Sequence, residues 1–174
     1  MSKKTEIKEW KNHEGEVVAS DNGFDVIDCQ RCGFKHIIHI PTVDELENIY
    51  KHDYYKEEKP LYLERYQEDI DWWNMVYTQR YKIFEENLSE QQRDILDIGS
   101  GPGFFLLNGK KRGWKVKGIE PSIKAMEHSR SLNLEVEHGF FSEKTAPDLG
   151  KFDAINLGLV LEHIPDPEGL LKLI

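Results

Sequence analysis

The chain has 174 residues, of which 39% are hydrophobic, and a formal net charge of −9. That apolar content is enough for a folded core, whereas the acidic balance disfavours a nucleic-acid partner, because such proteins carry a basic patch or stripe. The sequence contains no apolar run of the roughly 18 residues that a membrane span needs. No apolar stretch follows the N-terminal lysines, as it would in a secretory signal. The composition therefore predicts a globular, cytoplasmic protein that does not enter a membrane.

Residues 1–41 are predicted to form a small strand-rich segment. The stretch "VVASDNGFDVIDCQRCGFKHIIHIP" is divided into short strands by Asp-Asn-Gly and Cys-Gly turns. The character of the sequence changes after this stretch, so we expect the segment to be a domain of its own.

The two cysteines of the chain, Cys29 and Cys32, lie in this segment at C-x2-C spacing. A structural zinc site needs four ligands, and such a pair supplies two of them. His13 is the candidate for the third. The fourth is His36 or His39, only one of which can join, because residues three apart on a strand face opposite sides; we select His39. The alternatives are a metal-free remnant of such a site and a redox pair of cysteines.

Residues 42–90 are predicted to be helical and to form a lid or linker. Thr42 and Glu45 have the spacing of a capping box, which predicts a helix that runs to about Tyr50. Between 63 and 88, apolar residues recur at steps of three and four, as in one long amphipathic helix or two nearly collinear ones. We expect its aromatic side chains to pack as a core stripe against the next domain; the alternative is a lid over a ligand site.

Residues 91–174 alternate between strand and helix patterns, which predicts the α/β class with a parallel sheet. Beyond the fourth strand the sequence offers only the first turns of a helix. We therefore expect a domain truncated after strand four, with an exposed strand edge available for self-association. The expected strands are 94–99, 114–119, 133–138 and 152–158, and the expected helices are 103–112, 121–131 and 166–174.

A glycine-rich loop, in "ILDIGSGPGFF", follows the first of these strands. In an open α/β sheet such a loop lies at the carboxyl edge, where ligands bind. Its glycines let the backbone approach a ligand closely, and the N–H groups at the start of the next helix favour an anionic group. A dinucleotide-binding loop needs a small residue where this chain has Phe104. A nicotinamide-dependent oxidoreductase is therefore the weakest alternative.

Three motifs in order resemble those of the class I S-adenosylmethionine-dependent methyltransferases. The first is Asp97 followed by x-Gly-x-Gly-x-Gly, the second is Glu120 in "WKVKGIEPS", and the third is "FDAINLGLVLEHIPDPEGLL". The resemblance implies a Rossmann-like domain that binds S-adenosylmethionine, with Asp97 on the methionine side and Glu120 at the ribose hydroxyls. It implies the following cofactor-binding residues: Asp97, Gly99, Ser100, Gly101, Gly103, Glu120, Pro121, Phe140, Phe141, Leu157 and Gly158, with Tyr66 as part of a lid.

Two sites depart from the family pattern or are open to a second interpretation. Phe140 and Phe141 stand where many members have an acidic residue at the adenine, so stacking must replace that contact. His163, next to Glu162, is the candidate catalytic base, because histidine is the side chain that most often transfers protons in catalysis. The alternative is that His163 orients the helix that follows.

The N-terminal stretch "RCGFKHIIHIPTVDELENIYKHDYY" resembles half of a small zinc-binding module found ahead of methyltransferases that act on nucleotide-linked sugars. That resemblance implies a structural zinc ion and a sugar or other polar metabolite as methyl acceptor. The sequence as a whole thus predicts an S-adenosylmethionine-dependent methyltransferase acting on a small molecule. The alternative is a non-catalytic S-adenosylmethionine-binding module, or pseudo-enzyme.

Overall fold

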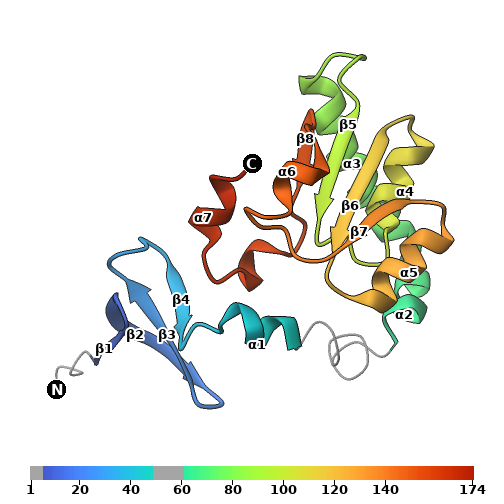
Figure 1. Cartoon of the computed structure of the whole chain (residues 1–174). Coiled ribbons are helices and arrows are strands. Elements are labelled where there is room, and N and C mark those ends of the chain that lie inside the picture. Colours follow the sequence, from blue (N-terminus) through green and yellow to red (C-terminus); the bar gives the residue numbers. More distant parts are fainter. Residues whose placement is uncertain (1–5, 49–60) are drawn as a thin grey trace. The chain divides into compact units, whose positions relative to one another are not determined.

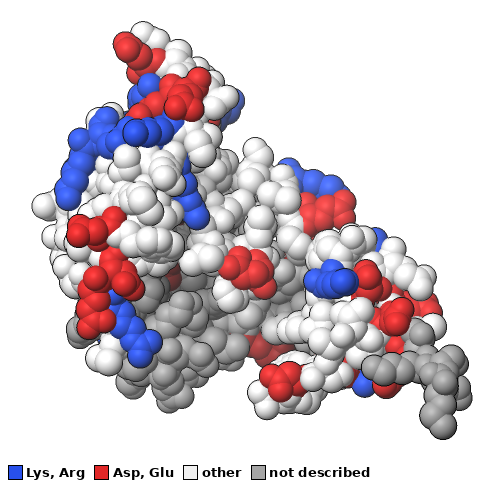
Figure 2. Space-filling view, turned by 180° about the vertical axis from the view of Figure 1, so that it is seen from behind, with Lys and Arg blue, Asp and Glu red and all other residues white. Residues whose placement is uncertain are grey.

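The computed structural model describes residues 6–48 and 61–174. The described residues divide into two compact units at the boundary between Thr42 and Val43, and each unit is described by itself. None of the helices in the described ranges has the length and apolar character needed to cross a membrane. On the face shown in Figure 2, basic and acidic side chains are interspersed.

The N-terminal unit is an antiparallel four-stranded sheet with the strand order β1-β2-β3-β4 (Figure 1). The Asp-Asn-Gly turn joins β2 and β3 through Asn22 and Gly23, both with positive φ, as a tight hairpin requires. The buried core consists of Ile27, Cys29 and Ile38, with a few partly buried neighbours. The strands are β1 (Ile7–Trp10), β2 (His13–Asp21), β3 (Phe24–Cys29) and β4 (Lys35–Ile38).

The second unit begins with helices. Helix α1 (Val43–Asn48) starts directly after Thr42. The helix was expected to run to about Tyr50, but residues 49 and 50 lie outside the described ranges. The predicted stripe from 63 to 88 forms two helices, α2 (Tyr62–Glu68) and α3 (Ile70–Asn87), which meet at Asp69. As expected, aromatic side chains of this stripe enter the core of the unit.

A parallel sheet follows, as predicted, and its strand order is β7-β6-β5-β8 (Figure 1). Side chains of α3, α4 and α5 share one core cluster with Ile95 and Val136 of the sheet. Leu96, Ile98 and Ile119 lie in a second cluster with Leu149 of α6. The elements are β5 (Asp94–Ile98), α4 (Phe104–Lys111), β6 (Lys115–Glu120), α5 (Ile123–Ser131), β7 (Glu135–His138), α6 (Ala146–Leu149), β8 (Ala154–Asn156) and α7 (Pro167–Leu171).

Some elements differ from the expectation. Strand β8 has three residues and is followed by a short 3-10 helix, Leu161–His163, instead of running to 158. Helix α7 ends at Leu171. The four-residue helix α6 was not predicted, because a single turn is too short to show helical periodicity.

Gly109, on the face of α4 that meets α3, is required by close packing. A Cβ atom there would lie 2.1 Å from Tyr81 Oη and 2.4 Å from Cζ. Tyr81 is fully buried, and its hydroxyl donates a hydrogen bond to the Phe105 carbonyl at 3.3 Å. In an unhindered helix, Gly→Ala stabilises by about 1 kcal/mol; here the added methyl group must displace a packed ring.

We expect Gly109→Ala to lower the free energy of unfolding by about 2 kcal/mol, as overpacking typically does. Urea denaturation followed by circular dichroism measures the effect. In the Tyr81→Leu background, which lacks Oη, Cζ and Cε1, the three atoms nearest to the added methyl group, the same substitution should cost less. An equal cost in both backgrounds would contradict this account of the helix contact.

Candidate functional site

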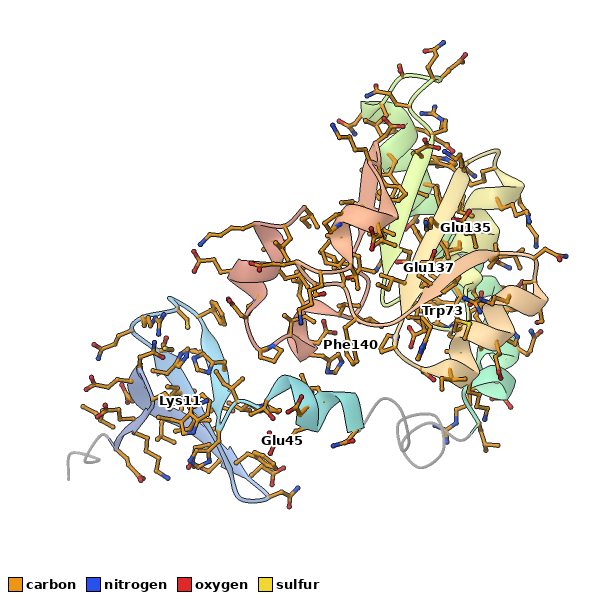
Figure 3. All side chains as sticks on the ribbon, viewed as in Figure 1. Lys11, Glu45, Trp73, Glu135, Glu137 and Phe140 are labelled. Carbon is orange, nitrogen blue, oxygen red and sulfur yellow. The ribbon has the colours of Figure 1, made fainter. Side chains whose placement is uncertain are left out.

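A cavity of about 580 Å³ lies at the carboxyl end of the parallel sheet. The loops that follow all four strands line it, which matches the usual position of ligand sites in such sheets. Its size is typical of small-molecule sites. Phe140, on the loop after β7, contributes an aromatic wall (Figure 3). The predicted residues that line the cavity are Asp97, Gly99, Ser100, Gly101, Glu120, Pro121, Phe140, Phe141, Gly158 and His163.

The glycine loop after β5 has a left-handed backbone at Gly99, Gly101 and Gly103. A Cβ atom at Gly99 would lie 2.6 Å from Val160 Cγ2. At Gly103 it would lie 2.6 Å from Ser129 Oγ, on α5. Gly103 therefore allows α4 and α5 to pack closely and does not line the cavity, although the sequence predicted it as a cofactor contact.

Glu120 ends β6 with a buried carboxylate that is held by the glycine loop. Its Oε2 accepts a hydrogen bond from the Gly101 N–H and its Oε1 one from the Ser122 N–H, both at 2.8 Å. A carboxylate has about four acceptor positions, so each oxygen can accept a further hydrogen bond. Burial raises the pKa of Glu120 to about 7, although the two N–H donors oppose the shift.

Asp97, at the other side of the loop, is also buried. Its Oδ1 accepts a hydrogen bond from Asn156 Nδ2 at 2.6 Å. Burial raises the pKa of Asp97 to about 7; the Asn156 amide opposes the shift and the charge of Glu120 adds to it. Two carboxylates are thus placed in one cavity where a positively charged ligand would favour their ionised forms.

Arg80 of α3 is a cavity residue that the sequence analysis missed. Its Nη1 donates a hydrogen bond to Asn156 Oδ1 at 3.3 Å, so Asn156 joins a cation to Asp97. A Cβ atom at residue 158 would lie 2.8 Å from Arg80 Nη1, which means that Gly158 makes room for the guanidinium. The available signal was a polar residue, Asn156, at the end of the short apolar strand β8, where it is buried.

The structure does not bring four of the predicted residues to the cavity. Tyr66 is buried in the core, where its ring stacks on Phe104 with 3.5 Å between centroids, so it lies behind the cavity wall and not over the ligand space. Leu157 packs against the Leu96 cluster. The remaining two are Gly103, described above, and Glu162, which is exposed and does not line the cavity.

The four parallel strands, the glycine loop after β5 and the carboxylate that ends β6 define the Rossmann-like fold of class I S-adenosylmethionine-dependent methyltransferases. The chain belongs to the methyltransferase domain family, whose sequence model matches residues 65–174.

Similar proteins support this classification. A "Ubiquinone biosynthesis O-methyltransferase" of Coxiella burnetii is 28% identical over 116 residues, which cover 59% of this chain and 50% of the relative. A protein of the same name from Alkalilimnicola ehrlichii is 37% identical over 81 residues, or 43% of this chain and 33% of the relative. The chain thus spans half or less of the length of these curated relatives.

A solved structure shares the fold. The plantazolicin methyltransferase BpumL in complex with SAH superposes with a TM-score of 0.55 at 19% identity. The superposition covers 74% of this chain and 51% of that protein.

Proposed function

We propose that this chain carries the donor site of a methyltransferase that transfers a methyl group from S-adenosylmethionine to a small molecule. The observation that carries the proposal is the buried Glu120 carboxylate held against the glycine loop, with an acceptor position left on each oxygen. A ribose diol presents two neighbouring hydroxyl donors, which suit such a carboxylate. The carboxylate at the end of β6 therefore fits a nucleoside.

The other cavity residues fit the remaining parts of S-adenosylmethionine. The side chain of Arg80 offers a cation for the methionine carboxylate, and Asp97 offers an anion for the amino group. Ser100, in the glycine loop, also lines the cavity. Phe140 and Phe141 line the side where the adenine is expected.

When bound, S-adenosylmethionine supplies an electrophilic methyl group on a sulfonium sulfur. The protein needs mainly to hold donor and acceptor in line and to keep water out, since positioning alone can account for much of the rate. The apolar side chains of Phe104, Phe140 and Phe141 serve the second task. His163, at the cavity on the segment after β8, would accept the proton of an acceptor hydroxyl at a ring nitrogen.

The methyl acceptor is proposed to be a small molecule with a nucleophilic oxygen. This is supported by two relatives described above, which are named as O-methyltransferases of ubiquinone biosynthesis. A sugar or other polar metabolite remains the prediction made from the N-terminal segment, and the names of these relatives do not point to sugars.

Calorimetry and a transfer assay test the proposal. We expect S-adenosylhomocysteine to bind about tenfold or more tightly than 5′-methylthioadenosine, which lacks the amino-acid half that Arg80 and Asp97 would hold. NAD should give no measurable binding, and preferential binding of NAD would contradict the proposal. Methyl transfer to a panel of phenols, carboxylic acids and nucleotide sugars then separates an enzyme from a non-catalytic binding module, which would bind the cofactor and methylate none of them.

A further inference from the structure

A cluster of two cysteines and two histidines lies on one side of the N-terminal sheet. The ligand atoms of its four members all lie within 4.8 Å of one another. His13 Nδ1 is 3.3 Å from Cys32 Sγ and 3.7 Å from Cys29 Sγ, and the rings of His13 and His36 meet edge to face at 5.0 Å. Cys29 is buried and Cys32 is partly buried. The members are His13, Cys29, Cys32 and His36.

The pairing of the strands explains why these residues meet. Gly15 of β2 is paired with Cys29 of β3, and His13 lies two residues before Gly15, so His13 and Cys29 share a face of the sheet. His36 of β4 is paired with Ile27, two residues before Cys29, and therefore shares that face as well. Cys32 joins these three residues through the turn between β3 and β4.

The C-x2-C turn brings Cys32 back over Cys29. The Gly33 N–H donates to the Cys29 carbonyl at 3.0 Å, and Gly33 has a φ of 72°, which favours glycine. The Cys29 N–H donates to the Phe34 carbonyl at 3.3 Å, which closes the hairpin. The sequence Cys-x-x-Cys-Gly is thus folded so that both thiols face the histidines.

The fourth member is His36, and not His39 as selected from the sequence. His39 lies three residues further along, beyond the end of β4, and its ring packs edge to face on Trp10 with 5.8 Å between centroids. Because side chains alternate between the two faces of a strand, the sequence showed that only one of these two histidines could join the cysteines. The pairing of β4 with β3, which decides between them, could not be known from the sequence.

His36 provides a second, independent indication of a ligand. Its Nδ1 lies 2.8 Å from the carbonyl oxygen of Ile37, the arrangement in which Nδ1 carries the proton and donates it. In the neutral ring Nε2 then carries the lone pair, and it is a buried atom that accepts no geometrically defined hydrogen bond from the described residues. A backbone hydrogen bond at one ring nitrogen and a free lone pair at the other are typical of a metal-bound histidine.

We propose that His13, Cys29, Cys32 and His36 bind one Zn²⁺ ion that stabilises the N-terminal sheet. Bond lengths of about 2.0–2.3 Å in a tetrahedral site require ligand atoms about 3.3–3.8 Å apart. The two His13–cysteine distances already lie in that range. Two thiolates and two imidazoles match the donor set of structural zinc and leave no position open for a substrate.

The small size of the unit explains why a metal would be useful. Its buried core consists of Ile27, Cys29 and Ile38. Units of this size rarely bury enough apolar surface to fold alone, and a structural metal is one of the usual remedies. Zinc would join β2, β3, β4 and the turn between β3 and β4.

The test measures zinc content and affinity in the full chain. We expect about one zinc per chain in the wild-type protein. Co²⁺ substitution should give the intense visible absorption of a tetrahedral site together with a thiolate charge-transfer band. His36→Ala should weaken zinc binding, measured by competition with a chromogenic chelator, by about a hundredfold or more.

Matched variants make the assignment specific. His39→Ala changes a neighbouring histidine outside the cluster and should leave zinc binding unchanged. His36→Cys replaces one zinc ligand with another and should retain the metal, which covers the case in which His36→Ala fails to fold. Wild-type protein without zinc, cysteines isolated as a disulfide, or equal losses in His36→Ala and His39→Ala would each overturn the proposal. None of these readouts depends on methyl transfer.

Discussion

Replacing Glu120 with glutamine is expected to weaken binding of S-adenosylhomocysteine about a hundredfold. Hydrogen bonds to a charged group contribute about 1.5–3 kcal/mol each, and about 1.4 kcal/mol corresponds to a factor of ten in affinity. The carboxylate accepts from Gly101 and Ser122 and would accept two more hydrogen bonds from a ribose diol. Glutamine carries no charge. Its amide N–H₂ group can only donate, so it cannot accept the hydrogen bonds from N–H or O–H groups that the carboxylate oxygen in its place accepts. Isothermal titration calorimetry measures the change.

Glu127→Gln serves as the control for this prediction. It makes the same chemical change at an exposed position of α5 and should leave the affinity unaltered. Glu120→Gln removes a buried charge but leaves one of the two backbone N–H groups without its acceptor, so circular dichroism at the titration temperature is used to show that both variants are folded. If Glu120→Gln bound S-adenosylhomocysteine as tightly as the wild type, the ribose assignment would be wrong.

The parallel sheet could be predicted from the sequence because each of its signals is local. Ile95, Leu96 and Ile98 form a short apolar run that ends at a glycine turn, and the alternation of strands and helices leaves few topologies open. The end of β8 could not be predicted in the same way. The chain after Asn156 is still apolar, but it turns away into a 3-10 helix, and hydrophobicity alone does not distinguish these two conformations.

The site was predictable where a motif reports on backbone geometry, and not where contacts join distant parts of the chain. Asp97 and Glu120 were found because they stand at the ends of two strands next to a glycine loop. Arg80 reaches Asn156 across 76 residues, and no spacing in the sequence encodes that contact. The choice of His36 over His39 likewise depends on the pairing of β3 with β4.

Binding of S-adenosylhomocysteine is expected to tighten as the pH rises from 6 to 8. Burial raises the pKa of both Glu120 and Asp97 to about 7, so a large share of these groups is protonated in the free protein at pH 6. Hydroxyl and ammonium donors of the ligand favour the ionised carboxylates. Binding at low pH must therefore release protons, and the dissociation constant should fall about tenfold for each carboxyl group that has to ionise, with a plateau above pH 8.

Calorimetry in buffers of different ionisation enthalpy counts the protons released on binding, and so tests the origin of this pH dependence. At pH 6 the wild-type protein should release protons, and Glu120→Gln should release about one fewer, because it lacks one of the two buried acids. Glu127→Gln should match the wild type. If the affinity were constant between pH 6 and 8, or rose as the pH fell, the buried carboxylates would not be the groups that hold the ligand.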